Sequence, residues 1–74
     1  MYEKLKEIIS RVMPDLDLSN VSEDSRLLED LKFDSLAIMM MAMEIESEFG
    51  IRFEGPVVLK TVKDVMNYIE EKQK

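Results

Sequence analysis

The chain contains no cysteine among its 74 residues, and this limits how such a short polypeptide can hold a fold. Disulfides and thiolate metal sites are not available, so the fold depends on burying apolar side chains. Apolar residues make up 46% of the sequence, which is enough for a core and argues against disorder. We therefore expect residues 1–74 to form one domain.

Two stretches separated by a long loop repeat apolar residues at helical spacing. The first stretch predicts a helix over residues 2–13, which ends at Pro14 because the residue before a proline is pushed out of the α region. The second predicts a central helix that Asp34 caps and that runs to Phe49. Gly50 then supplies the left-handed residue that commonly ends a helix.

The loop between these helices, residues 14–34, is unusually long for a compact domain, and such loops tend to be functional. It is rich in acidic residues, and its leucines and Val21 can attach it to a core. Residues 25–31 could form a short helical turn within it.

A last helix is expected after Thr61, which with Asp64 resembles a capping box. Gly55 and Pro56 indicate a turn before it, and residues 57–59 fit either one short helical turn or an irregular link. The predicted fold is therefore all-α, a small bundle of three to four helices with a long first loop.

The central helix carries two apolar stripes on roughly opposite faces. One is the expected core face, formed by Ile38, Met41, Ala42, Ile45 and Phe49. The other has the same spacing and consists of Leu36, Met39, Met40 and Met43. A domain of this size cannot easily bury both faces, so the second stripe is a candidate partner surface. A contact between two copies of the chain is the competing interpretation.

Composition also argues against several classes of function. Histidine and cysteine are both absent, which removes the commonest general base and most nucleophile–base pairs, so we do not expect an enzyme. A net charge of −6 opposes binding to nucleic acid. No apolar run approaches membrane-spanning length and the N-terminus lacks the layout of a signal peptide, so we expect a cytoplasmic protein without membrane insertion.

No metal site is expected either. Residues 15–20 begin like a calcium-binding loop, but Asn20 stands where that loop needs glycine and Arg26 where it needs glutamate. The chain also lacks the histidine and cysteine ligands that zinc prefers.

Ser35 is the candidate functional residue, because it follows the acidic loop at the first turn of the central helix. Unpaired N–H groups and the positive end of the helix dipole would favour a phosphate attached to its hydroxyl. The hydroxyl has no base nearby in the sequence, so it suits an attachment point better than a nucleophile. The competing interpretation is that Asp34 and Ser35 only cap the helix, and the dipeptide alone does not decide between the two.

Residues 28–36 (LEDLKFDSL) resemble the signature of acyl carrier proteins, in which an acidic pair and a leucine precede two residues and then Asp-Ser-Leu. Residues 43–51 resemble the end of the central helix in that family, and residues 61–69 resemble its final helix. The resemblance covers essentially the whole chain, including its length, acidity and long first loop.

The resemblance implies that Ser35 receives a covalent 4′-phosphopantetheine from coenzyme A, with Asp34 and Leu36 beside it in the attachment motif. The thiol of that group would carry acyl intermediates as thioesters, which accounts for a carrier without cysteine. The implied function is a stand-alone carrier in fatty acid or specialised acyl or polyketide-type biosynthesis. The implied partners are a phosphopantetheinyl transferase and acyl-transferring or synthase enzymes.

The chain also departs from the family pattern. Lys32 stands where glycine is usual, and Ala37 and Met40 stand where fatty-acid carriers place acids that contact basic patches of partner enzymes. We therefore predict a more apolar docking face on a monomeric protein. The residues expected to contact partners are Leu36, Ala37, Met39, Met40, Met43 and Glu46.

Three further alternatives remain open at this point. An aminoacyl or peptidyl carrier, an unmodified helical interaction module, and a small carboxylate enzyme are each compatible with the composition. Leu28, Leu31, Met41, Ile45, Phe53 and Leu59 either line a cleft that shelters an acyl chain or form an ordinary core, and the sequence does not separate these two interpretations.

Overall fold

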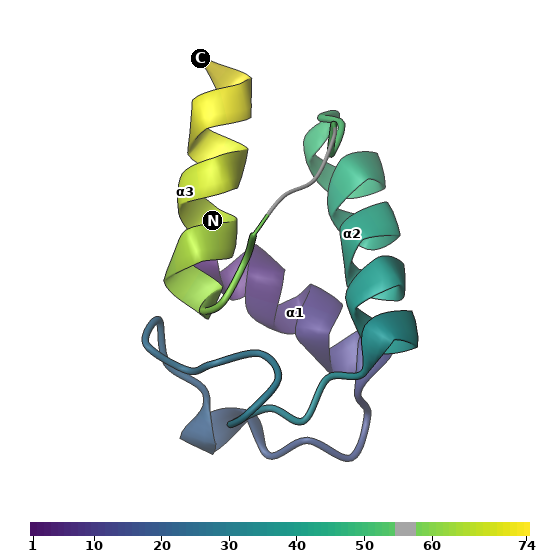
Figure 1. Ribbon diagram of the computed structural model, residues 1–74, viewed down its shortest axis with the longest axis vertical. Helices are drawn as coiled ribbons and strands as arrows, with labels where there is room; N and C mark the ends of the chain where they lie inside the picture. Colours follow the sequence, from purple (N-terminus) through teal and green to yellow (C-terminus); the bar gives the residue numbers. More distant parts are fainter. Residues whose placement is uncertain (55–57) are drawn as a thin grey trace.

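The computed structural model describes residues 1–54 and 58–74. Over these residues the fold is all-α, with α1 (Tyr2–Val12), the short 3₁₀ helix η1 (Leu18–Asn20), α2 (Ser35–Phe49) and α3 (Val62–Gln73). In Figure 1 α2 and α3 both run roughly along the long axis, and α1 crosses between their lower halves. The long first loop runs beneath all three helices, at the end where α2 and α3 begin. The predicted bundle is confirmed.

The helix boundaries follow the local signals in the sequence. α1 ends at Val12, two residues before Pro14. Gly50 follows α2 in the left-handed conformation, with a φ of 66°, and its N–H donates to the carbonyl of Glu46. The turn predicted at Gly55 and Pro56, together with Val57, lies outside the described residues.

The capping box of α3 is confirmed. The hydroxyl of Thr61 accepts the N–H of Asp64, and the carboxylate of Asp64 accepts the N–H groups of Thr61 and Lys60. These backbone hydrogen bonds from Lys60 and Thr61 lower the pKa of Asp64 below its ordinary value, because they stabilise the charged form. The cap therefore holds the start of α3 at neutral pH.

One apolar core joins the three helices and the long loop. Within it, α1 packs against α2. Its buried members come from the three α-helices, from the long first loop and from Ile51 after α2, and they are Leu5, Ile8, Ile9, Val21, Leu27, Leu31, Phe33, Ala37, Met41, Ile45, Ile51, Val62, Val65 and Ile69. On α2, Met41 and Ile45 are buried as predicted, whereas Ile38, Ala42 and Phe49 are half-buried.

The long loop is tied to α3 by backbone hydrogen bonds. The N–H of Leu27 donates to the carbonyl of Lys60 over 2.9 Å, and the N–H of Val62 donates to the carbonyl of Ser25 over 3.0 Å. Within residues 25–31, the N–H of Asp30 donates to the carbonyl of Arg26. This hydrogen bond spans four residues, as in one turn of a helix, so the short turn expected here is present, although the segment does not extend into a helix. A further short helical element, which was not expected, lies earlier at η1, where Asp17 caps Leu18–Asn20.

Lys32 has a left-handed backbone with a φ of 61°. This conformation is unfavourable for a residue with a Cβ atom. The turn that contains Lys32 brings the N–H of Phe33 to the carbonyl of Leu27, over 2.9 Å, and places Phe33 in the core. Lys32 therefore adopts a strained conformation immediately before the start of α2.

We expect Lys32→Gly to stabilise the fold by about 0.5–1 kcal/mol, because glycine relieves the left-handed strain but loses more chain entropy on folding. Denaturant unfolding at neutral pH measures this change. Lys32→Ala is the matched control, since it removes the ammonium but keeps a Cβ atom in the left-handed region. A Lys32→Gly protein no more stable than Lys32→Ala would contradict the prediction.

None of the helices in the described part of the chain combines the length and the apolar character needed to cross a bilayer.

Candidate functional site

The start of α2 presents an exposed serine beside a well-made helix cap. The carboxylate of Asp34 accepts the N–H of Ala37 over 2.7 Å, so Asp34 is the N-cap as predicted. Ser35 is exposed at the first helical position. Among the described residues its hydroxyl has no hydrogen-bond partner, and neither has the backbone N–H of Ser35 or Leu36. Asp34 therefore supplies the cap, and the serine oxygen is left available.

This arrangement fits a phosphate ester on Ser35. Two unoccupied N–H groups and the positive end of a fifteen-residue helix lie at the serine, and both favour an anion. The side chain is directed to solvent, so a long substituent meets no buried wall at its root. The chain itself provides no histidine that could activate the hydroxyl.

The turn before α2 is held by an exposed ion-pair cluster. The carboxylate of Asp30 accepts the N–H of Arg26 over 2.8 Å and also contacts its guanidinium over 3.3 Å. The backbone hydrogen bond and then the side-chain hydrogen bond from Arg26 lower the pKa of Asp30 below its ordinary value. Because Phe33 anchors the other side of this turn in the core, the position of Asp34 and Ser35 is fixed by the fold.

Four apolar side chains gather on the exposed face of α2 and follow Ser35 along the helix. Leu36 and Met43 are each 63% exposed, Met39 is 60% exposed and Met40 is 44% exposed. We call these four residues the apolar face. Their exposure matches the prediction that one of the two stripes of this helix stays outside the core.

Ala37 is a correction to the predicted face. It is only 6% exposed and belongs to the core cluster. Its position explains this, because Ala37, Met41 and Ile45 are spaced four residues apart and form one stripe of the helix. Helical spacing in the sequence could have revealed it. Glu46 is half-buried, and its carboxylate accepts the N–H of Phe53 over 2.8 Å, so it also holds the loop after α2.

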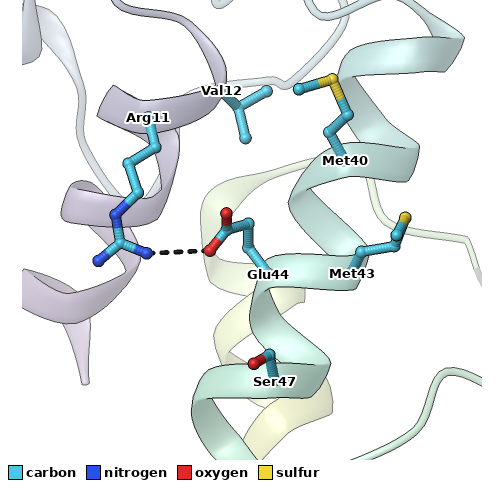
Figure 2. Close-up of a pocket in the computed structure, with 6 residues that line it drawn as sticks. All are labelled: Arg11, Val12, Met40, Met43, Glu44 and Ser47. Atoms are coloured by element: carbon cyan, nitrogen blue, oxygen red, sulfur yellow. Dashed lines mark hydrogen bonds and ion pairs between the residues drawn. The ribbon is translucent and has the colours of Figure 1, made fainter.

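A groove borders the apolar face where α2 meets α1. It has a volume of about 360 Å³ and is lined by Arg11, Val12, Met40, Met43, Glu44 and Ser47. In Figure 2 the side chains of Val12 and Met40 point toward each other, while the guanidinium of Arg11 reaches the carboxylate of Glu44 over 2.9 Å. Sequence reasoning missed Arg11 and Val12, since nothing local indicates a contact with residues about 30 positions later.

The structure also bears on the proposed cargo cleft. Leu28 is 60% exposed, so it does not line an interior space. Leu31, Met41 and Ile45 are at most 3% exposed and pack within the core cluster. For these three residues the interpretation as an ordinary core is the one that fits.

Comparison with known proteins agrees with the resemblance to acyl carrier proteins seen in the sequence. The chain matches the family model described as phosphopantetheine attachment site over residues 3–69. It is 39% identical over 74 residues to an acyl carrier protein of Thermotoga maritima, covering 97% of this chain and 90% of that relative. It is 40% identical over 73 residues to an acyl carrier protein of Rickettsia canadensis, covering 96% of this chain and 84% of that relative.

The fold is also similar to a solved structure. The apo doublet acyl carrier protein from prodigiosin biosynthesis superimposes with a TM-score of 0.66 at 27% identity, covering 96% of this chain and 37% of that longer chain. The family model and the relatives together cover nearly all of the sequence. The chain therefore belongs to the acyl carrier protein family, whose members act as carriers by means of a covalently attached 4′-phosphopantetheine.

Proposed function

We propose that Ser35 is the residue to which 4′-phosphopantetheine is attached. The observation that carries this proposal is the exposed hydroxyl of Ser35, which has no partner among the described residues although it lies at the capped start of α2. When it is bound, the group supplies a thiol that holds an acyl group as a thioester.

The residues of the chain have distinct roles in this proposal. Ser35 supplies the oxygen of the phosphoester, and the free N–H groups of Ser35 and Leu36 stabilise the charge of the phosphate. Asp34 orients the first turn through its hydrogen bond to the N–H of Ala37. The chain has no histidine, and no carboxylate of the described residues is hydrogen-bonded to the Ser35 hydroxyl, so we assign the base that removes the serine proton to the transferase. The carrier thus presents an oxygen and performs no catalysis.

The direct test is to incubate the purified chain with coenzyme A and a phosphopantetheinyl transferase and then measure its mass. We expect a gain of one phosphopantetheine per chain, located by fragmentation on the peptide that contains Ser35. No gain, or a gain on another peptide, would contradict the proposal.

We further propose that the apolar face and the groove beside it dock the partner enzymes. The face follows Ser35 directly along α2, so a protein that covers it also reaches the serine. Glu46 flanks it on the same helix, Glu44 beside it is paired with Arg11, and the whole chain carries a net charge of −6. Like charges oppose a second copy at this face, whereas a partner with an apolar contact surface bordered by basic residues is complementary to it. We therefore propose a monomeric carrier.

Met40→Gln tests this docking proposal. Met40 lies on both the face and the groove, so a buried amide there must lose water without gaining a partner, at about 1–3 kcal/mol. We expect the kcat/KM for loading by the transferase to fall roughly tenfold. Met40→Leu is the matched control, since it keeps an apolar side chain of similar volume. Equal loading rates for the two variants would contradict docking at Met40.

The apolar face also bears on the pathway. Fatty-acid carriers of the family usually place acids where this chain has Met40 and the buried Ala37, so partners that read an acidic helix find fewer charges here. We infer that this chain serves a dedicated acyl-transfer pathway in the cytoplasm, as one carrier domain over residues 1–74. Transfer assays with acylated carrier and candidate synthases would test this.

A further inference from the structure

The apolar face is unusual because three of its four side chains contain sulfur. The chain has seven methionines, and the face holds Met39, Met40 and Met43. Met41 lies on the same helix but is only 1% exposed. The two sides of α2 thus present methionines in opposite environments, three accessible and one enclosed.

Composition makes the exposed methionine sulfurs the most easily oxidised atoms of the unmodified chain, and apart from Met1 the exposed methionines of the described residues are the three on α2. The sequence contains no cysteine and no tryptophan. Peroxides oxidise accessible thioethers, and the product is a polar, chiral sulfoxide that disrupts methionine-rich contacts. At Met40 the change occurs opposite Val12 in the groove, where no apolar contact can accommodate a sulfoxide oxygen (Figure 2).

We propose that Met39, Met40 and Met43 form a peroxide-oxidisable site, and that their oxidation weakens the docking of partner enzymes. The first part depends on exposure alone, and the second rests on the docking function proposed above. The sulfur attacks one peroxide oxygen, the O–O bond breaks, an S–O bond forms, and the peroxide is reduced to water as the sulfur loses two electrons. Methionine sulfoxide reductases, one for each sulfoxide epimer, release the oxygen as water and restore the thioether while two thiols are oxidised to a disulfide.

The site is arranged so that oxidation affects docking and not folding. Its three sulfurs lie outside the core, and the core methionine of the same helix is shielded. On the proposal, an oxidised carrier keeps its helices and an accessible Ser35 but presents a polar surface to partners. Docking would then require the removal of water from the sulfoxides, and loading should slow roughly tenfold.

The test uses the chain of residues 1–74 without the attached group, because the thiol of that group would itself react with peroxide. The chain is treated with hydrogen peroxide, the peroxide is removed with catalase, and sulfoxides are located by peptide mass spectrometry. We expect oxidation at Met39 and Met43 first, then at Met40, while Met41 stays reduced in the folded protein. Oxidation of Met41 as early as the other three would overturn the site.

The functional consequence is measured as the rate of loading by a phosphopantetheinyl transferase that never meets the peroxide. We expect the treated chain to load roughly tenfold more slowly, with an unchanged helical circular dichroism spectrum, and to recover after treatment with sulfoxide reductase. The triple variant Met39→Leu, Met40→Leu, Met43→Leu should load normally, and peroxide should not slow its loading although the exposed Met1 can still be oxidised. Slower loading of the treated triple variant, or normal loading of a fully oxidised face, would overturn the consequence.

The experiments distinguish failure of the docking proposal from failure of the oxidation proposal. If Met40→Gln loads as fast as the starting protein, the face does not dock the transferase, whatever its state of oxidation. The order in which the sulfurs are oxidised is read from mass spectra without any partner, so that measurement stands independently.

Discussion

Ser35→Ala should gain no mass when it is incubated with coenzyme A and a phosphopantetheinyl transferase, even at long times and high transferase concentrations. The substitution removes the only oxygen through which the phosphoester can form at this site. Asp34 supplies the cap and Ser35 is exposed, and alanine is a good helix former. We therefore expect the helical spectrum and the unfolding midpoint to stay within experimental error of those of the starting protein.

Ser22→Ala is a suitable control for this experiment. Ser22 is also an exposed serine, in the long loop, and among the described residues its hydroxyl contacts only the hydroxyl of Ser25, over 3.5 Å. This variant should load fully. A mass gain that survives Ser35→Ala would show that another residue is modified, and the role of Ser35 would then be lost.

The effect of Ser35→Ala also differs in kind from that of Met40→Gln. In the serine variant the final fraction of loaded chain falls to zero, because no acceptor atom remains. In the methionine variant only the initial rate of loading falls, because the acceptor is intact and the encounter complex is weaker. Measuring both the end point and the initial rate therefore separates attachment from docking.

The sequence predicts the fold well where one local signal decides the structure. Pro14, Asp34, Gly50 and Thr61 mark helix ends by the geometry of their own backbone or side chain, and each acts as predicted. The long loop was harder to predict, because its order comes from hydrogen bonds between Ser25 and Leu27 and the start of α3, more than 30 residues later. No periodicity in the sequence reports such pairing.

The candidate site could be predicted only where its residues are neighbours in the sequence. Ser35 and Asp34 lie in one contiguous motif, so their relation is local. The groove depends on Arg11 meeting Glu44, which requires the tertiary packing of α1 on α2. Ala37 was predicted at the partner face because it stands where fatty-acid carriers place an acid, whereas its spacing with Met41 and Ile45 assigns it to the core.

Truncating a side chain should lower the stability of the fold strongly on the buried face of α2 and hardly at all on its exposed face. Ile45 is fully buried, and Ile45→Ala should destabilise the fold by about 2–5 kcal/mol through lost burial and the cavity that remains. A domain of this size has a total stability of about 4–11 kcal/mol, so this single change removes a large share of it. Denaturant unfolding should show a much lower midpoint, and thermal unfolding a matching shift.

Met43→Ala is the matched variant on the same helix, two residues earlier. Its side chain is 63% exposed, so its removal should change the free energy of unfolding by no more than about 0.5 kcal/mol. Loading by the transferase should nevertheless slow, because an apolar contact of the docked complex is lost. If Met43→Ala were as destabilising as Ile45→Ala, the apolar face would belong to the core. A stable variant with slower loading would mean that the fold and the docking reaction use separate faces of one helix, which leaves the exposed methionines free to be changed, or oxidised, without unfolding the carrier.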